Sequence, residues 1–509
     1  MNVSDHRRDY AAYCSAVELE KFGRHAGHTS ALDLRPTEER YADLWTPERV
    51  ADLRALRDET PEDFETERAG LTALAGASLL KRAEAHAHYV TEELGRCEAA
   101  ARFVWRGASV GAQDLPELLA VEPDASSRRE LAARALDALS PCEDLRAARL
   151  ESLAEAARAG GFDDRRSLYE SYTGADLGRL AEDGARFLER TERAYHSRLA
   201  AWAAREAGPA APGPLHQADS PRFARAPHLD QHFGADRFQA VYAGTLAGLG
   251  VRTGSQRNLL IDDAERPGKF AHSACFAVAP PEDVRLVFGA RRQGADFYRR
   301  TLFEAGRAQM FAWASREAVA RRPEFVRAPD RATELGHAFL LSGLRAEQSW
   351  LAEFARARAD ELREAAATAA LVELHEARRD AALVGHALAL DRAADPRSDA
   401  LTENFAESLT RATGFRHEPA GGLLEADEWF GSATRLRARA FAAGLREHLR
   451  SRHGHRWFAS HAAGDELIDV WNTASRYRVE ELARLLWGEA LGLDLLAESA
   501  NNSLGETHG

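Results

Sequence analysis

The segment GADFYRRTLFEAGRAQMFAW, from Gly294 to Trp313, decides the fold of this chain. We expect it to be a helix that follows an extended stretch lining a cleft. At its centre lies the run FEAGR, from Phe303 to Arg307. With histidine at both ends, this run would become HEAGH, in which two histidines on one helical face bind zinc and the glutamate activates a water. The residues around the helix decide whether this comparison is meaningful.

Sequences on both sides of this helix make the comparison specific. Upstream, Arg266–Phe276 reads RPGKFAHSACF, and downstream Thr333–Leu341 reads TELGHAFLL. This succession resembles the thimet oligopeptidase and oligoendopeptidase F family of zinc metallopeptidases, in which an RPGK-type strand, an HExxH helix and a later glutamate ligand follow in this order. The likeness covers most of the chain, since ERYADLW near Tyr41 and TLAGLGV after the predicted linker also look like that family. It implies a mainly α, two-lobed helical fold with a deep cleft.

The resemblance assigns roles to some residues and fails at others. Glu304 matches the general base of the family, and Glu334 matches its third zinc ligand. The first two ligands fall on Phe303 and Arg307. Phenylalanine has no lone pair for a metal, and arginine stays protonated and cannot coordinate a cation. We therefore expect no zinc site and no cofactor, because a zinc site needs three protein ligands.

Arg307 is the residue that takes the place of a zinc ligand. It lies three positions after Glu304, so the two side chains meet on one helical face. If the fold brings Glu334 close, as in the family, the guanidinium occupies roughly the position of the ion. Two interpretations stay open. The cluster is a structural, mutually satisfied charge group, or Arg307 holds a substrate carboxylate or a developing oxyanion.

Further residues of the same region are candidates for substrate binding, and one alternative metal set remains. The substrate-binding candidates are Lys269, His272, Glu334 and His337. Glu334 and His337 form an ExxH pair that offers two ligands from one helix face, with Glu304 or His272 completing a metal set. A half-buried structural histidine is the simpler interpretation of His337.

Other motifs are weaker evidence for a metal site or a catalytic site. His375 opens HEARRD without the second histidine of a zinc motif, and the HGH of His453 and His455 is expected in a surface turn. Cys275 is expected to be buried, and a strand places it on the opposite face from His272, which argues against a nucleophile–base pair. No Gly-rich phosphate loop, dinucleotide fingerprint or GxSxG turn is present.

Composition indicates a globular intracellular protein. The 509 residues are 45% hydrophobic and 29% charged, with a net charge of −13. No apolar run reaches the length of a membrane span, and the N-terminus lacks the apolar core of a signal peptide. The four scattered cysteines, without a CxxC pair, are interpreted as reduced thiols of a cytoplasmic protein; these are Cys14, Cys97, Cys142 and Cys275.

The pattern along the chain suggests two lobes. Residues 38–206 follow the helical period almost throughout, and the Pro- and Gly-rich stretch 208–227 is expected to be a linker. After it, residues 257–290 contain short apolar segments bounded by Pro and Gly, which predict a small β-sheet. We expect an N-terminal helical lobe over 1–207 and a C-terminal lobe over 208–509 that carries the FEAGR helix and the sheet.

These observations lead to three functional hypotheses. The first is a repurposed enzyme without zinc, an acyl or aminoacyl transferase in bacterial specialised metabolism such as antibiotic biosynthesis. It would act on a small amine or hydroxyl substrate, with Glu304 as base, Arg307 as electrostatic stabiliser and an activated ester or an aminoacyl-tRNA as donor. The second is a non-catalytic pseudopeptidase that binds a peptide or protein partner. The third is a peptidase with a rearranged metal site. No membrane partner is expected.

Overall fold

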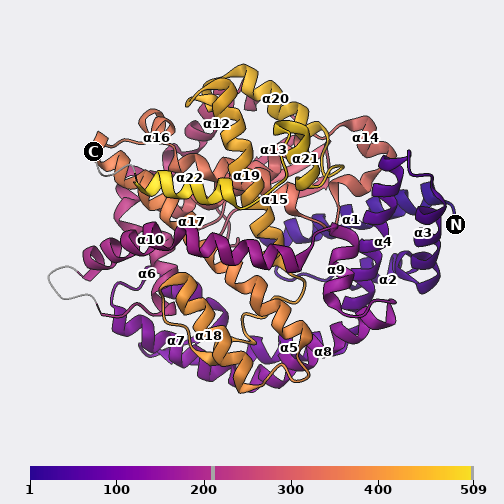
Figure 1. Ribbon diagram of the computed structural model, residues 1–509, viewed down its shortest axis with the longest axis horizontal. Helices are drawn as coiled ribbons and strands as arrows, with labels where there is room; N and C mark the ends of the chain where they lie inside the picture. The colour runs from indigo at the N-terminus through magenta and orange to yellow at the C-terminus, as the bar shows by residue number, and fades with distance from the viewer. Residues whose placement is uncertain (208–212, 506–509) are drawn as a thin grey trace. The chain divides into compact units, whose positions relative to one another are not determined.

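The computed structural model describes residues 1–207 and 213–505, and these are mainly helical, as predicted (Figure 1). Alanine, leucine, arginine and glutamate dominate the helical segments, and these residues lose little freedom in a helix. Within the described ranges, no helix is long and apolar enough to cross a membrane. The helices are α1 (Val3–His25), α2 (Arg35–Arg40), α3 (Pro47–Glu59), α4 (Glu65–His86), α5 (His88–Ala100), α6 (Leu115–Val121), α7 (Ala125–Leu139), α8 (Glu143–Ala159), α9 (Arg165–Thr173), α10 (Leu177–Ala207), α11 (Ser220–Arg225), α12 (Phe238–Gly248), α13 (Gly294–Trp313), α14 (Arg316–Arg321), α15 (Ala332–Ser342), α16 (Gln348–Phe354), α17 (Ala359–Arg392), α18 (Asp399–Thr413), α19 (Gly431–His453), α20 (His461–Asn472), α21 (Val479–Trp487) and α22 (Asp494–Gly505).

Two compact units divide the chain, and each collects three separate segments. The first unit consists of Met1–Leu79, His228–Ala369 and Arg437–Leu496, and the second of Leu80–Pro227, Ala370–Leu436 and Ala497–Gly509. This division differs from the predicted one at 207/208. The chain passes from one unit to the other five times, four times inside α4, α17, α19 and α22 and once between Pro227 and His228, at the end of the predicted linker. A helix that continues through a boundary leaves no loop or change of composition for the sequence to reveal.

A three-stranded sheet in the first unit lies where short apolar segments predicted it. Its strands are β3 (Leu259–Asp262), β4 (Ala274–Ala279) and β5 (Asp283–Val287), in the order β3-β5-β4. β5 pairs in parallel with β3 and antiparallel with β4. Helices α1 and α13 contact β4. Most of β4 is buried, which explains why it reads as a continuous apolar run, whereas β5 alternates polar residues with buried valine and leucine.

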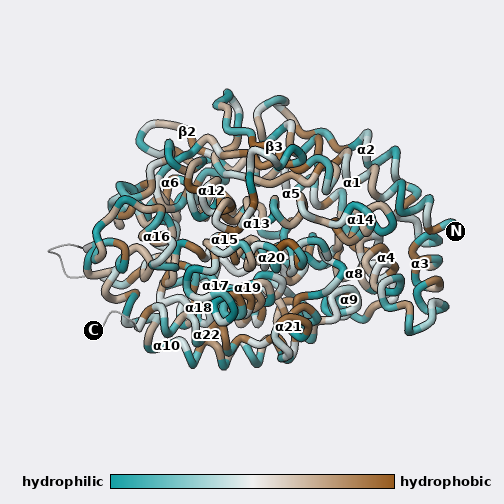
Figure 2. Tube along the Cα trace, turned by 90° about the horizontal axis from the view of Figure 1, so that it is seen from above, coloured by the Kyte–Doolittle hydropathy of each residue, from teal (hydrophilic) through white to brown (hydrophobic). Residues whose placement is uncertain are grey.

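Helix α13 packs closely on α15, and the two lie side by side in both views (Figures 1 and 2). Gly306 permits this approach. A Cβ atom at this position would lie 2.4 Å from the carbonyl oxygen of His337 and 2.7 Å from the Cα of Ala338. Any larger residue would therefore separate the helices, and the contact brings the side chains of α13 and α15 to one place.

The second unit contains a β-hairpin that the helical pattern did not predict. Strands β1 (Arg102–Trp105) and β2 (Ala108–Gly111) pair antiparallel. Arg106 and Gly107 form the turn, both with positive φ, at 48° and 83°. Two left-handed residues give the turn whose twist matches a hairpin. The sequence indicated only a helix break here, because Arg106 is not a residue that usually signals such a turn.

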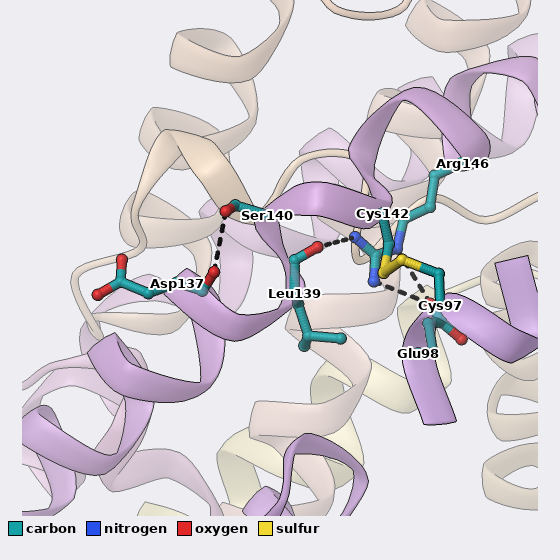
Figure 3. Close-up of a disulfide and its surroundings, with 7 residues drawn as sticks. All are labelled: Cys97, Glu98, Asp137, Leu139, Ser140, Cys142 and Arg146. Atoms are coloured by element: carbon teal, nitrogen blue, oxygen red, sulfur yellow. Dashed lines mark hydrogen bonds and ion pairs between the residues drawn. A yellow bond between two sulfur atoms is a disulfide. The ribbon is translucent and has the colours of Figure 1, made fainter. Parts of the chain in front are cut away.

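Cys97 and Cys142 form a disulfide in the second unit, with Cα atoms 5.8 Å apart (Figure 3). Beside it, Arg146 donates to Glu98 Oε1 at 2.8 Å and to the Leu139 carbonyl at 3.4 Å. The interpretation of all four cysteines as reduced thiols is therefore wrong for this pair. Forty-five residues separate the two cysteines, so no local spacing motif revealed that they meet.

The predicted linker 208–227 is folded over much of its length. Residues 208–212 lie outside the described residues. Ser220–Arg225 forms α11, with a proline in its first turn, where the fixed φ suits a helix start. Phe223 is fully buried and packs edge-on against Trp202, with ring centroids 5.0 Å apart. The Pro-rich composition therefore marks a tightly packed connection over these residues, and the linker interpretation is wrong for them.

Candidate functional site

Helix α13 presents one partly exposed stripe while most of its other residues are buried. The stripe follows the i, i+3, i+4 spacing of a single helical face. Its members are Asp296, Arg299, Arg300, Phe303, Glu304 and Arg307. Asp296 accepts hydrogen bonds from Arg299 at 2.8 Å and from Arg300 at 2.8 Å. The stripe therefore carries ordered, paired charges, and the FEAGR residues occupy its C-terminal half.

Arg307 connects the residues that the sequence singled out. Its Nη1 donates to Glu304 Oε2 at 2.6 Å, and its Nε donates to Glu334 Oε1. Nη1 also lies 3.4 Å from the carbonyl oxygen of Cys275. The structure thus brings Glu304, Arg307 and Glu334 together, with the guanidinium between the two carboxylates. We call Glu304, Arg307, Glu334 and the neighbouring Arg331 the arginine–glutamate cluster.

One oxygen of Glu304 is anchored and the other is open. Oε2 accepts from Arg307 and, at 2.9 Å, from the backbone N–H of Cys275. Among the described residues, neither Glu304 Oε1 nor Arg307 Nη2 has a hydrogen-bond partner, and neither is among the fully buried orphan atoms. Both side chains are 15% exposed. The cluster therefore offers one free carboxylate oxygen, on Glu304, and one free N–H₂ group, on the Arg307 that is paired with it.

Glu334 is held by two arginines. Arg331 Nη2 donates to its Oε1 at 3.0 Å, and Arg331 Nε donates to its Oε2 at 3.3 Å. Burial alone would raise the pKa of this carboxyl, but Arg307 and Arg331 outweigh it and lower the pKa to about 2. Burial likewise opposes the charge of Arg307, and the two carboxylates nevertheless hold its pKa well above the ordinary value. Glu334 and Arg307 are therefore both charged at neutral pH.

The cluster also closes the edge of the sheet. β4 is an edge strand, and an edge strand offers free backbone groups to an added peptide. Glu304 takes the N–H of Cys275, Arg307 approaches its carbonyl, and Arg327 donates to the carbonyl of Ala277. A peptide strand would have to displace these side chains. The Cys275 thiol is buried, which raises its pKa and argues against a nucleophilic role.

Phe303 occupies the position that the resemblance gives to a zinc ligand, and it belongs to an aromatic stack. Its ring packs edge-on against Phe339, with centroids 5.1 Å apart. The guanidinium of Arg439 lies 4.0 Å from the centroid of the Phe339 ring. The stack borders Glu304 with an apolar surface that is only partly exposed.

The residues at the cluster do not suit a zinc ion. Phe303 has no donor atom, and the Arg307 guanidinium contacts both carboxylates that would otherwise face a cation. Within the described residues, no group of three or more His, Cys, Asp or Glu side chains is arranged to hold a metal ion. The alternative set of Glu334 and His337 with Glu304 or His272 therefore does not assemble.

His337 lies beneath the cluster rather than in it. It is 1% exposed, and its Nδ1 accepts from Trp471 Nε1 at 3.2 Å. Its Nε2 is buried and has no partner among the described residues. A side chain with so little exposure cannot contact a substrate in this structure. The structure therefore does not support His337 as a substrate-binding residue.

Lys269 and His272 lie in the loop before β4. Lys269 is buried and its Nζ donates to the Asp262 carbonyl at 3.1 Å, to Asp262 Oδ1 at 3.3 Å and to the Ala264 carbonyl at 2.8 Å. All three of its hydrogens are used, so the structure gives Lys269 a structural position. His272 is half-buried, and burial together with Arg300 lowers its pKa to about 4. It borders the N-terminal half of the α13 stripe.

Two weaker histidine candidates have structural partners. His375 is buried between Tyr195, at 2.8 Å, and Ser220, at 2.9 Å. His453 binds Glu466 at 2.8 Å, and His448 binds the other oxygen of the same carboxylate at 2.7 Å. Both histidines therefore have protein partners that account for them.

Sequence reasoning missed four contributors to the site. Arg331 stands three positions before Glu334, a spacing that predicts contact on a helix, and this signal was available. Phe339 and Arg439 belong to distant segments, and no local pattern connects them. The backbone of Cys275 takes part through its N–H and carbonyl, which no side-chain motif can indicate.

His337 makes stability dependent on pH. Burial lowers its pKa from 6.5 to about 3, so below pH 6.5 the unfolded chain binds a proton that the folded chain excludes. This contribution to stability is complete above pH 6.5 and is lost as the pH falls toward 3. The loss is about 1.4 kcal/mol per pH unit, or about 2 kcal/mol at pH 5.

Urea unfolding at pH 7 and pH 5 measures this effect. We expect His337→Gln, which retains an acceptor for Trp471, to show a smaller loss between the two pH values than the unsubstituted protein. His88→Gln, a substitution at a 65% exposed histidine, should leave the pH dependence unchanged. Equal losses in the protein and in His337→Gln would contradict the assignment.

Comparison with solved structures identifies proteins that have a similar fold. No protein-family model and no curated protein matches the sequence. Among solved structures, PZ peptidase A with inhibitor 2 matches with a TM-score of 0.64 and 11% identity, over 96% of this chain and 87% of that chain. The BsuCP crystal structure matches with a TM-score of 0.62 and 12% identity, over 99% of this chain and 98% of that chain. These likenesses show a helical metallopeptidase-like fold of the kind that the sequence predicted, and at these identities they show the fold alone.

Proposed function

We propose that this protein is a metal-independent acyl or aminoacyl transferase whose reacting groups are Glu304 and Arg307. The observation that supports this proposal is that each of the two side chains has some polar atoms held by hydrogen bonds and one polar atom that is not. Glu304 is anchored through Oε2 and Arg307 through Nε and Nη1, which leaves Glu304 Oε1 and Arg307 Nη2 without a partner among the described residues. A fixed acceptor beside a fixed cationic donor is the arrangement that acyl transfer requires.

The chemical step uses one proton and one developing negative charge. A small amine or hydroxyl attacks the ester carbonyl of the donor and loses its proton to Glu304 Oε1. The carbonyl oxygen becomes an oxyanion, which Arg307 Nη2 stabilises by a charge-assisted hydrogen bond. When the ester C–O bond breaks, the leaving alkoxide takes the proton back from Glu304. The acyl group ends on the nucleophile, and the enzyme returns to its starting state.

The proposed reaction requires no zinc ion, and the loss of the zinc site is part of the proposal. A zinc peptidase depends on a metal-bound water as nucleophile. The fold keeps Glu304 and Glu334 in place, but the guanidinium between them neutralises the charge that would attract a metal. Without an activated water, an already activated acyl donor and a better nucleophile than water are needed.

The donor is proposed to be an activated ester, with aminoacyl-tRNA as the macromolecular example. Three arginines flank the reacting pair: Arg299 and Arg300 lie on α13, and Arg331 lies directly before α15. Their guanidinium groups suit a phosphorylated donor, although carboxylates already pair with each of them. The Phe303–Phe339 stack offers an apolar surface to the acyl side chain. Such a reaction fits bacterial specialised metabolism, including antibiotic biosynthesis.

A pseudopeptidase that binds a peptide-like ligand is the second candidate. The observation that favours it is the mutual neutralisation of Arg307 by two carboxylates, which gives a stable group without any catalytic need. This candidate predicts ligand binding without turnover and full tolerance of Glu304→Gln. The two candidate functions therefore predict different effects of the Glu304→Gln substitution.

The test combines metal analysis with an acyl-transfer assay on the full chain. Bulk tRNA charged with labelled amino acids serves as donor, and hydroxylamine at neutral pH serves as a small nucleophile. We expect substoichiometric zinc, activity that survives chelation, and a loss of about 100-fold or more in Glu304→Gln, the usual range for removing a general base. The readout is aminoacyl hydroxamate above the uncatalysed rate, measured by mass spectrometry.

Glu39→Gln is the matched control, because it makes the same change at an exposed residue of α2. It should retain full activity. Near-stoichiometric zinc, or activity that chelation abolishes, would contradict the metal-independent mechanism and favour a zinc peptidase. Absence of transfer together with unchanged ligand binding in Glu304→Gln would favour the pseudopeptidase.

A further inference from the structure

A cavity lies at the C-terminal end of α13, within the first unit. Its volume is about 700 Å³, which is in the range of small-molecule sites. The end of α13, the turn into α14, the loop after α12 and the end of α20 line it. Trp313, at the end of α13, is six residues beyond Arg307, about 9 Å along a helix axis. None of the cluster residues lines this cavity.

Arg252 gives the cavity an unbalanced positive charge. It is exposed, and within the described residues it has no ion pair or side-chain hydrogen bond. The other charged residues of the wall are neutralised by partners. Arg316 pairs with Glu282 at 2.8 Å, and Glu317 pairs with Arg321 at 2.9 Å. The cavity therefore favours a ligand with one negative charge, which a guanidinium binds best as a planar carboxylate.

Trp313 gives the cavity a rigid aromatic wall. Its Nε1 donates to Gln309 Oε1 at 3.1 Å, which fixes the orientation of the indole. Gln309 is fully buried, donates to the Tyr242 hydroxyl at 2.8 Å and exchanges two hydrogen bonds with Gln256. A ring held in this way loses little freedom when a flat ligand stacks on it. Val251, Pro281 and Ala314 add apolar surface.

The dipole of α13 does not cancel the preference of the cavity for a negatively charged ligand. The C-terminal end of α13 points carbonyl groups toward the cavity, and free carbonyls repel an anion. Asn258 Nδ2 donates to the Ala312 carbonyl at 2.8 Å, which removes one of these acceptors, and to the Pro281 carbonyl of the same cavity wall at 2.7 Å. Asn472 lines the cavity with a side-chain amide that has no partner among the described residues, so its N–H₂ group is available as a donor.

We propose that this cavity is a binding site for a small planar aromatic carboxylate, stacked on Trp313 and paired with Arg252. The aromatic ring of the ligand replaces water over the indole and the apolar wall. Its carboxylate accepts hydrogen bonds from the guanidinium of Arg252, and Asn472 supplies a further donor. This site is independent of the proposed transferase reaction, because it uses none of the residues assigned to that reaction.

A pair of matched probes tests the site on the full chain. 2-Naphthoate is a planar aromatic carboxylate, and 2-naphthamide has the same shape without the charge. Titration calorimetry should show saturable binding of 2-naphthoate and at least tenfold weaker binding of the amide, as expected for the loss of a charge-assisted hydrogen bond. Arg252→Gln should remove the preference for the carboxylate. Trp313→Leu should weaken both probes.

Arg257→Gln is the control, because it removes the same charge from an exposed arginine that does not line the cavity. It should leave both affinities unchanged, and thermal unfolding of all variants checks that they are folded. The proposal is overturned if 2-naphthoate does not bind at millimolar concentration. It is equally overturned if binding is the same in Arg252→Gln as in Arg257→Gln, or if Trp313→Leu, folded, binds both probes as well as the unsubstituted protein.

Discussion

Replacement of Arg307 by methionine is expected to lower the free energy of unfolding by about 3–5 kcal/mol, the usual cost of removing one partner from a buried ion pair. Methionine fills a similar space but leaves Glu304 and Glu334 facing each other without the guanidinium that neutralises them. Glu304 keeps the N–H of Cys275, and Glu334 keeps Arg331, so most of the loss is uncompensated charge. Urea unfolding at pH 7 measures this difference.

Two further variants separate charge from packing. Arg331→Met removes a guanidinium that is 53% exposed and should cost about 1 kcal/mol or less, because solvent screens such pairs. The double variant Arg307→Met with Glu334→Gln should recover part of the stability lost in Arg307→Met, since a neutral amide no longer repels Glu304. If the double variant is less stable than the single one, charge repulsion is not the cause.

The unfolding assay also bears on metal binding. If a zinc ion held Glu304 and Glu334 together, added zinc would stabilise the unsubstituted protein strongly and chelation would destabilise it. The geometry predicts instead that zinc has no effect on the unsubstituted protein, whose two carboxylates already contact Arg307. Thermal unfolding with and without zinc distinguishes these outcomes.

Removal of the Cys97–Cys142 disulfide is expected to cost about 3–4 kcal/mol, because the bond closes a 45-residue loop and restricts the unfolded chain. The double substitution Cys97→Ser with Cys142→Ser should unfold at lower urea concentration than the oxidised protein. Reduction of the unsubstituted protein should shift its transition in the same direction. Both effects are measured by urea unfolding followed by circular dichroism.

Thiol counting provides the control for this prediction. In denaturant without reductant, the oxidised protein should react with a thiol reagent at Cys14 and Cys275 alone. Cys14→Ser, which removes a half-buried free thiol, should leave the response to reductant unchanged. Reaction of all four cysteines without reductant would contradict the disulfide.

Local patterns predicted the secondary structure and the helix of the site. The period of α13 and its FEAGR run placed Glu304 and Arg307 on one face, and a spacing of three residues was enough to predict their contact. Short apolar segments bounded by Pro and Gly predicted the sheet. Both are properties of residues close in sequence, which local sterics and hydrogen bonding determine. The hairpin of β1 and β2 escaped because its turn uses Arg106 with positive φ.

Most of the unit boundaries and the disulfide could not be predicted in this way. Helices α4, α17, α19 and α22 continue through four of the five boundaries, so no break in the pattern marks these four, whereas the boundary after Pro227 lies at the end of the Pro- and Gly-rich stretch. Cys97 and Cys142 meet because α5 and the start of α8 pack together, and packing depends on side chains distributed over the whole unit. The same holds for Lys269, whose role as a buried link to Asp262 appears only when the loop is folded.

The sequence by itself determined that the chain is mainly helical, which follows from periodicity, and that Phe303 and Arg307 cannot bind zinc, which follows from the chemistry of single side chains. Its resemblance to a metallopeptidase came from the order of the RPGK, FEAGR and TELGH segments. Only the tertiary structure decided what Arg307 does instead. Gly306 lets α15 approach α13, and this approach carries Glu334 to the guanidinium, while β4 brings the backbone of Cys275 to Glu304. Contacts between residues about 30 positions apart depend on how whole elements pack, and no local pattern contains that information.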